Sequence, residues 1–248
     1  MAVIYLTMEA KSETFYDDAM KGMKRYEDKH FGLALCDVPY GIGVGNMAYL
    51  KEMKTTVRQK NGTKMNGNRN KKPYTKKEWD SKPPPQEYFD ELRRVTKHQI
   101  IFGVQYVNWQ GLGTGRIKWD KGVAEGMSFK KYEMAYCSMI DNEITIPLLW
   151  AGMCQAKSLK EPMVQQGNKK LNEKRIHPCH KPIMLYQKLL KEFAKEGDII
   201  LDTHLGGGSS RIASHQMGFD FVGFEIDEEY YQKQEKRFNQ YISQYKMF

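Results

Sequence analysis

The chain has 248 residues, 40% of them hydrophobic, and its 39 Lys and Arg against 30 Asp and Glu give a formal net charge of +9. A chain of this length buries one substantial core, so we predict a single domain over residues 1–248. No apolar run approaches the roughly 20 residues that cross a bilayer, which excludes a membrane-spanning protein, and the positive charge favours a polyanionic partner.

The N-terminal residues indicate the cellular compartment, and the cysteines bear on metal and disulfide sites. Residues 1–6 lack the basic flank and cleavage site of a signal peptide, so a cytoplasmic protein with no membrane partner is expected. The four cysteines are far apart and form no C-x-x-C pair, which argues against a zinc ribbon or a disulfide framework. His177, Cys179 and His180 cluster, but further ligands at a favourable spacing are missing, so we predict no metal site.

Strands and helices alternate in the first half of the chain. Apolar runs predict buried strands, and apolar residues at helical spacing predict helices. In chain order we expect a strand over Val3–Thr7, a helix over Asp17–Asp28, a strand over Phe31–Cys36, a helix over Gln86–Lys97 and a strand over His98–Val107.

A basic insertion, residues 44–82, interrupts this half. Its stretch from Lys51 to Lys77 holds ten Lys and Arg against one acid, Glu52. A solvated, flexible loop is one interpretation. Because the stretch begins just beyond a candidate site at Asp37–Tyr40, we favour contact with a phosphate backbone.

The second half continues the alternation after an irregular segment. We expect strands over Tyr132–Ser138, Ile199–Asp202 and Phe221–Glu225, helices over Pro182–Lys195, Ser209–Met217 and Glu228–Tyr241, and irregular structure over residues 141–175. Strands that alternate with helices predict an α/β fold with a doubly wound, mostly parallel sheet.

The segment Asp37-Val38-Pro39-Tyr40 ends one of the buried strands. Ligands of open α/β sheets bind beyond the carboxyl ends of the strands. Asp37 offers acceptor oxygens, and the carbonyl of Val38, next to a proline, offers another in a fixed direction. Tyr40 offers a flat face for stacking. This combination indicates a site that binds an exocyclic amino group such as adenine N6.

A glycine loop later in the chain indicates a nucleoside cofactor. Gly206, Gly207 and Gly208 let the backbone approach a ligand, and Glu225 ends the next strand, where an acid accepts hydrogen bonds from ribose hydroxyls. A dinucleotide would bring a pyrophosphate, which Asp202 at the strand end disfavours. An acid there suits a cation, so S-adenosylmethionine is preferred to NAD. A structural turn without a ligand is the alternative.

Several segments resemble one known family. Asp37–Tyr40 is similar to D-P-P-Y, Asp202–Ser209 to D-P-F-x-G-S-G-T, Gly223–Asp227 to the strand and acid that follow, and His177–Pro182 to H-P-T-Q-K-P. The chain resembles the DNA amino-methyltransferases that modify adenine N6 or cytosine N4, in the β-type order that places the catalytic motif before the cofactor motif. The resemblance covers most of the chain and implies a Rossmann-like, seven-stranded methyltransferase sheet with a circularly permuted motif order.

The resemblance also implies roles. The cofactor would be S-adenosylmethionine, the partner double-stranded DNA, and the substrate a flipped-out base. Asp37 and the carbonyl of Val38 would accept hydrogen bonds from the amino group, Pro39 would fix the direction of that carbonyl, and Tyr40 would stack on the base. The cofactor would be held by Asp18, Ala19, Asp37, His177, Lys181, Asp202, His204, Leu205, Gly206, Gly208, Ser209, Glu225 and Ile226.

The chain departs from the family pattern at several of these motif positions. Val38 replaces a proline but keeps its carbonyl. Thr203 and His204 replace Pro-Phe, and Gly207 replaces Ser. Loss of the Phe weakens the expected packing around the cofactor.

Site-specific DNA adenine-N6 methylation is the first hypothesis, because Asp at the first motif position accompanies adenine more often than Ser, which is typical of cytosine-N4 enzymes. Cytosine-N4 methylation is the near alternative, and a degenerate, non-catalytic nucleic-acid-binding protein is a further one. Residues 44–82 and 141–175 are the candidate DNA-recognition regions, and the chain fits either a monomer or a homodimer.

Overall fold

The structure, a computed structural model, describes residues 10–43, 56–58, 64–66, 80–127, 130–165 and 167–245. The predicted strand Val3–Thr7 and most of the basic insertion lie outside the described residues. In the described ranges no helix has both the length and the apolar character that crossing a membrane requires.

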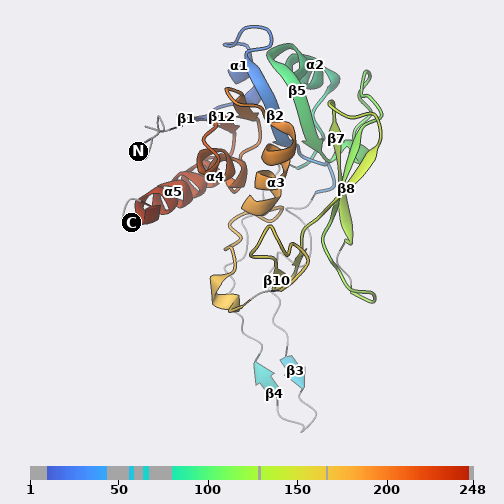
Figure 1. The fold of residues 1–248 in the computed structure, drawn as a ribbon, viewed down its shortest axis with the longest axis vertical. Helices are drawn as coiled ribbons and strands as arrows, with labels where there is room; N and C mark the ends of the chain where they lie inside the picture. Colours follow the sequence, from blue (N-terminus) through green and yellow to red (C-terminus); the bar gives the residue numbers. More distant parts are fainter. Residues whose placement is uncertain are drawn as a thin grey trace, which may run out of the picture.

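One mixed sheet organises the described part of the chain (Figure 1). Its eight strands, in spatial order, are β1 (Ser12–Tyr16), β12 (Asp220–Glu225), β11 (Ile199–Asp202), β2 (Phe31–Asp37), β5 (Thr96–Phe102), β7 (Tyr132–Cys137), β6 (Arg116–Asp120) and β8 (Glu143–Pro147). The first five strands are parallel to one another, β7 is antiparallel to β5 and β6, and β8 is parallel to β6. The doubly wound, mostly parallel fold is therefore confirmed.

Helices cover both faces of this sheet, because the buried strands carry apolar side chains on both sides. In β2, Leu33 and Leu35 belong to one core cluster, while Ala34 and Cys36 belong to the other. The first cluster packs against α3 (Ile183–Phe193) and α4 (Ser209–Gln216), and the second against α1 (Ala19–Met23) and α2 (Gln86–Val95). The last helix, α5 (Glu228–Tyr245), contacts β1 and β12.

The predicted helix over Asp17–Asp28 is too long. Helix α1 ends at Met23, and the chain continues in turns whose backbone bonds run from Arg25 to Gly22 and from Tyr26 to Met23. The guanidinium of Arg94, on α2, donates to the carbonyl oxygens of Met23 and Tyr26 at 3.4 and 3.0 Å. These long-range bonds satisfy carbonyls at the helix end and stop the helix early.

The predicted strand over His98–Val107 is displaced. Strand β5 begins at Thr96, directly after α2, and it ends at Phe102, because Gly103 adopts φ 87° and turns the chain into the 3-10 helix η3 (Val104–Tyr106). A left-handed residue breaks the extended backbone, and glycine adopts that conformation at little cost.

The sheet has one strand more than the seven expected. Strand β8 comes from the segment 141–175, and its Ile146 joins the core beside β6. The same segment also forms an antiparallel pair, β9 (Trp150–Ala151) with β10 (Cys154–Gln155), and a 3-10 turn, η4 (Lys169–Leu171). Within the basic insertion, β3 (Thr56–Arg58) pairs antiparallel with β4 (Lys64–Asn66).

Candidate functional site

A cavity of about 300 Å³ lies at the carboxyl ends of the parallel strands β2, β11 and β12. Many of the predicted site residues line it: Asp18 and Ala19 at the start of α1, Asp37 and Pro39 after β2, His177 and Lys181 before α3, His204, Leu205, Gly206 and Ser209 after β11, and Glu225 and Ile226 after β12. The structure thus brings the catalytic and cofactor motifs to one site, as the fold class predicts.

Lys181, which lines this cavity together with Asp37, joins two partly buried carboxylates. Its ammonium ion-pairs with Asp37 and with Glu133 of β7, whose Oε2 lies 3.2 Å from Nζ, and its side chain is only 3% exposed. Burial opposes the charge, but the two carboxylates outweigh it and raise the pKa of Lys181 above its ordinary value. Lys181 is therefore a permanent cation beside the predicted catalytic acid.

The pKa values of the two carboxyl groups shift in opposite directions, although burial acts alike on both. At Asp37 burial raises the pKa, and Lys181 opposes this rise without cancelling it. Burial acts in the same direction at Glu133, but there Lys181 and a second cation, Lys121, outweigh it and lower the pKa to about 2. Glu133 is therefore ionised, whereas at Asp37 burial favours the protonated acid and Lys181 favours the carboxylate.

Tyr40 lies against this cluster and does not line the cavity. Its hydroxyl donates to Oδ1 of Asp37 at 3.0 Å, and its ring stacks on Tyr106 with centroids 4.9 Å apart. Asp80 accepts hydrogen bonds from the backbone N–H groups of Tyr40 and Gly41 at 2.6 and 2.9 Å. These contacts fix the motif loop, and the stacking of Tyr40 on a base stays a prediction.

The side chain of Val38 is 2% exposed and packs in the core cluster that faces α2. It therefore does not line the cavity, whereas the neighbouring Asp37 and Pro39 do. The role of the Val38 backbone oxygen as the second acceptor also stays a prediction.

Asp202 and Gly208 do not line the cavity either. Asp202 is 1% exposed, and its oxygens accept hydrogen bonds from the backbone of His204 at 2.9 Å and from the hydroxyl of Ser210 at 2.5 Å. Burial raises the pKa of Asp202 to about 7, and these two bonds oppose the rise. Asp202 thus holds the loop and the start of α4, and its contact with the cofactor stays a prediction.

Glu225, in contrast, borders the cavity. Its carboxylate accepts from the backbone N–H of Gly206 at 2.8 Å and of Asp227 at 2.9 Å. Each carboxylate oxygen accepts two hydrogen bonds, so capacity for ribose hydroxyls remains. The Gly206 bond also ties the glycine loop to the end of β12.

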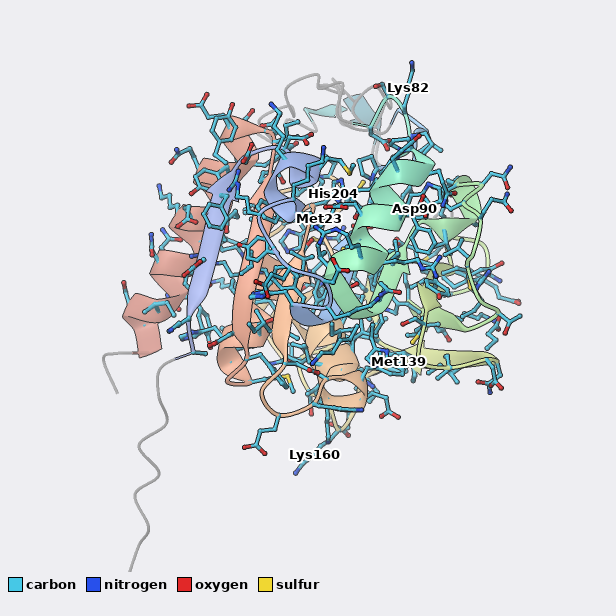
Figure 2. All side chains as sticks on the ribbon, turned by 90° about the horizontal axis from the view of Figure 1, so that it is seen from above. Met23, Lys82, Asp90, Met139, Lys160 and His204 are labelled. Atoms are coloured by element: carbon cyan, nitrogen blue, oxygen red, sulfur yellow. The ribbon has the colours of Figure 1, made fainter. Side chains whose placement is uncertain are left out.

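His204 takes the place of the Phe in the family pattern, and it keeps an aromatic contact. Figure 2 shows it between α1 and α2, and its ring meets Tyr88 edge-on with centroids 5.5 Å apart. Burial lowers the pKa of His204 to about 4, so the ring is neutral at pH 7 and packs as an aromatic group. Asp18 caps α1 by accepting from the backbone of Lys21 at 3.1 Å.

His177 is a second neutral imidazole at the cavity. Burial lowers its pKa to about 3, and its ring meets Tyr230 of α5 edge-on with centroids 4.4 Å apart. Its Nδ1 accepts from the backbone N–H of Cys179 at 3.2 Å. The imidazole therefore orders the turn before Lys181. In the part of the chain that the structure describes, no group of His, Cys, Asp and Glu forms a metal site.

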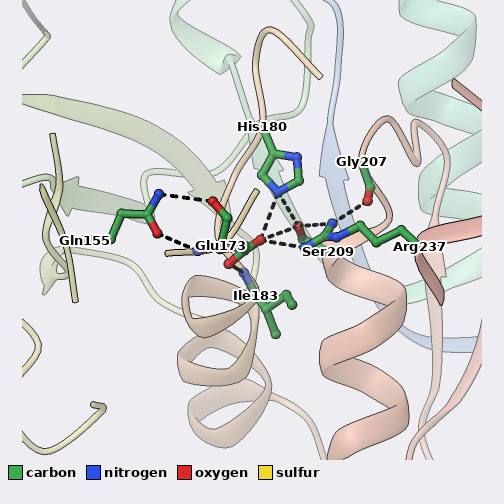
Figure 3. Close-up of polar contacts among 7 residues, drawn as sticks. All are labelled: Gln155, Glu173, His180, Ile183, Gly207, Ser209 and Arg237. Carbon is green, nitrogen blue, oxygen red and sulfur yellow. Dashed lines mark hydrogen bonds and ion pairs between the residues drawn. The ribbon is translucent and has the colours of Figure 1, made fainter. Parts of the chain in front are cut away.

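Glu173 is the centre of a polar network that reaches the glycine loop through Arg237 (Figure 3). Its Oε1 lies 2.8 Å from Nε2 of His180 and 2.6 Å from Nη2 of Arg237, and its Oε2 accepts from the backbone of Ile183 at 3.1 Å. Arg237 also donates to the carbonyl of Gly207. One carboxylate from the segment 141–175 thus links α3, α5 and the loop.

Glu133, Asp80 and Glu173 are site residues that the sequence does not reveal. Glu133 and Asp80 are far in sequence from the motif residues that they contact. Glu173 is close in sequence to His180 but far from Arg237 and the glycine loop. The one available signal is the position of Glu133, an acid within an otherwise apolar strand.

Comparison with protein-family models gives a match over most of the chain. A family model described as a DNA methylase, of the N6 and N4 type, matches residues 45–236. The matched range begins after the Asp37–Tyr40 motif and covers more than half of the chain.

Curated relatives match over shorter stretches. The Type II methyltransferase M2.DpnII of Streptococcus pneumoniae is 34% identical over 61 residues, 25% of this chain and 23% of that protein. The putative methylase YubD of Escherichia coli (strain K12) is 34% identical over 68 residues, 27% of this chain and 30% of that protein. The match therefore spans less than a third of either relative.

Two solved structures share the fold. The complex of M1.HpyAVI with SAM has a TM-score of 0.50 at 16% identity and covers 91% of this chain and 98% of that one. The PvuII DNA methyltransferase, described as cytosine-N4-specific, has a TM-score of 0.51 at 9% identity and covers 92% of this chain and 87% of that one. At such identities the likeness shows the architecture and not the substrate.

Proposed function

Because the chain belongs to the DNA methylase family of N6 and N4 methyltransferases, we propose that it is a site-specific DNA adenine-N6 methyltransferase that uses S-adenosylmethionine. The observation that carries the proposal is the position of Asp37 and Tyr40, whose side chains meet beside the cavity that the glycine loop and Glu225 border.

The residues around the cavity fit the cofactor. Carboxylates at Glu225 and Asp18 suit ribose and adenine, the glycine loop permits close approach, and neutral aromatic rings at His204 and Tyr88 supply packing. When bound, the cofactor supplies a sulfonium methyl group for transfer. Asp37 and Glu225 line the cavity and would supply negative charge to it, which suits a cationic ligand.

The chain's own part in the reaction is to hold and polarise an amino group. Adenine N6 is a poor nucleophile because its lone pair is delocalised into the ring. Asp37 and the carbonyl of Val38 would accept hydrogen bonds from the two N6 N–H groups and turn the nitrogen lone pair toward the methyl group. Asp37 keeps acceptor capacity beside its bonds from Tyr40 and Lys181, because two carboxylate oxygens accept about four hydrogen bonds.

Lys181 supports this role electrostatically. Burial alone would favour the protonated acid at Asp37, which could accept less well. The ammonium of Lys181 favours the carboxylate, and Glu133 holds that ammonium in place. The proposed reaction requires no metal ion.

The test is transfer of a labelled methyl group to duplex DNA. The wild type should label DNA, and Asp37→Asn should lower the rate at least about 100-fold, because the amide lacks the charge that orients N6. Binding of S-adenosylhomocysteine, measured by calorimetry, should change less than about threefold. Asp28→Asn, at an exposed carboxylate, is the matched control and should keep wild-type activity. Full activity in Asp37→Asn would overturn the assigned role.

Cytosine-N4 methylation is the second candidate, because N4 is also an exocyclic amino group and a structure with this fold is described as cytosine-N4-specific. Asp at position 37 favours adenine within the family pattern. If the chain is instead a degenerate, non-catalytic nucleic-acid-binding protein, calorimetric titration with S-adenosylhomocysteine should show no heat of binding. Double-stranded DNA is the proposed partner, read by residues 44–82 and 141–175, with the chain acting as a monomer or a homodimer.

A further inference from the structure

Asp80 is a buried acid that fastens the chain on both sides of the Tyr40 Cα atom. It is 2% exposed, and its Oδ1 accepts from the backbone N–H of Tyr40 at 2.6 Å and from that of Gly41 at 2.9 Å. Its own carbonyl oxygen accepts from the N–H of Gly43 at 3.1 Å. Successive N–H groups that point at one oxygen form a concavity that suits an anion, which accounts for an acid at this buried position.

The two bonds to Oδ1 restrict the backbone of Tyr40. The N–H of Tyr40 belongs to the planar peptide before its Cα, and the N–H of Gly41 belongs to the planar peptide after it. The angle between these planes depends on φ and ψ of Tyr40 alone. Because one oxygen holds both N–H groups, both torsions are restricted. The direction of the Cα–Cβ bond, which carries the Tyr40 ring, is thereby set.

The same restriction reaches the carbonyl of Val38. The peptide that holds the N–H of Tyr40 also holds the carbonyl of Pro39, and the pyrrolidine ring of Pro39 fixes its φ. Only ψ of Pro39 therefore separates the restricted peptide from the one that carries the Val38 carbonyl. One carboxylate thus acts on both motif groups that have no contact with the acid's own side chain, the ring and the second acceptor.

Residues 80–85 hold this acid against the motif loop. Gly41 adopts φ 70°, and a Cβ added there would lie 2.6 Å from Cδ of Pro83, so glycine permits the close approach. The carbonyl of Pro84 accepts from the indole N–H of Trp109 at 2.9 Å. Trp109 is buried in the core cluster that faces α2. The segment is therefore tied both to the motif loop and to the core.

We propose that Asp80 is a positioning residue for methyl transfer. Its carboxylate holds the backbone of Tyr40 so that the ring and the Val38 carbonyl receive the flipped-out base in the reactive orientation. The inference rests on the proposed function, since the base is the group that is positioned. Asp80 is not among the residues that line the cavity, so its effect reaches the base through the motif loop.

Two substitutions at this position test the two bonds. Asp80→Ala removes both, whereas in Asp80→Asn the amide oxygen can still accept from both N–H groups. The measurement is single-turnover transfer of a labelled methyl group to saturating duplex DNA, per site that binds S-adenosylhomocysteine in calorimetry. The rate should fall at least about 30-fold in Asp80→Ala and at most about fivefold in Asp80→Asn, because misplaced reacting groups lose rate steeply.

Binding and a matched variant supply the controls. Affinity for S-adenosylhomocysteine should stay within about twofold of wild type in both variants, since a positioning residue changes the reaction step and not cofactor binding. Asp90→Ala removes an exposed carboxylate on α2 that bonds to the side chain of Gln86, and it should keep the wild-type rate.

A double-mutant cycle tests whether Asp80 acts through the ring. In a Tyr40→Ala background the ring is absent, so Asp80→Ala should cost at least about tenfold less than it costs in the wild type. An equal cost in both backgrounds would overturn action through Tyr40.

Each other outcome has a defined meaning. A wild-type rate in Asp80→Ala would overturn the inference and leave the proposed function standing. Loss of S-adenosylhomocysteine binding in Asp80→Ala would assign Asp80 to the stability of the fold and also overturn the inference. A wild type that transfers no methyl group to DNA would overturn the proposed function, and the inference would fall with it.

Discussion

Lys181 is a buried residue whose ammonium compensates two partly buried carboxylates, Asp37 and Glu133. Removing one partner of a buried ion pair leaves a charge without its counter-ion, which typically costs about 3–5 kcal/mol. We expect Lys181→Met to lower the free energy of unfolding by about that amount in urea titrations. Lys233→Met is the control: its pair with Glu229 is 41% and 38% exposed, so the change should stay below about 1 kcal/mol. Equal effects from both variants would contradict the account of the cluster.

Asp202 predicts a pH dependence of stability. Its pKa is raised to about 7 in the folded chain, whereas the unfolded value is near 4. The folded state therefore holds the proton more tightly, so this group's contribution to stability is present below about pH 4 and is lost as pH rises to about 7. Asp202→Asn should gain stability relative to wild type between about pH 5 and pH 8, measured by urea denaturation at both values. A constant difference between the two proteins would show that Asp202 is not buried as an acid.

Elements act on the site through their ends, and Gly103 at the end of β5 is the clearest case. It adopts φ 87°, and a Cβ there would lie 2.2 Å from the Tyr40 ring. Gly103→Ala should cost roughly 1–2 kcal/mol in left-handed strain and also displace Tyr40, so DNA methylation should fall by more than tenfold. Gly126→Ala is matched in backbone strain, with φ 79°, but meets nothing within 4 Å. It should lose stability alone, and a fall in methylation in both variants would contradict the link to Tyr40.

At the same scale, local pattern predicts some elements and misses others. Strands β2 and β11 follow from uninterrupted apolar runs that only a buried strand explains. Strand β1 has the polar sequence Ser-Glu-Thr-Phe-Tyr and exists because it pairs with β12, which lies about 200 residues further along the chain. The early end of α1 likewise depends on Arg94, which no local pattern reveals.

The residues of the candidate site also fall into those that the sequence reveals and those that it does not. Asp37, Lys181 and Glu225 stand in motifs whose residues and order resemble one family, so they could be named before the structure. Glu133 and Glu173 act through contacts between distant segments, and their importance follows from burial beside cations and not from spacing.

The whole molecule carries its positive charge unevenly, and the basic insertion is its densest part. Changing Lys71, Lys72, Lys76 and Lys77 to Gln should weaken duplex binding and flatten its salt dependence, by about 0.9 in the log–log slope for each DNA phosphate that these lysines neutralise. Binding of S-adenosylhomocysteine should stay unchanged. Lys191→Gln with Lys195→Gln, outside the insertion, is the control. An unchanged salt slope in the quadruple variant would remove the insertion from DNA binding.

Methylation of adenine N6 in DNA leaves a product that analysis of the modified nucleosides identifies. Duplex DNA is incubated with the wild-type protein and labelled S-adenosylmethionine, digested to nucleosides and separated by chromatography with mass detection. We predict label in N6-methyladenine, present with the wild type and absent with Asp37→Asn. Label found only in N4-methylcytosine, or in no nucleoside at all, would contradict the claim.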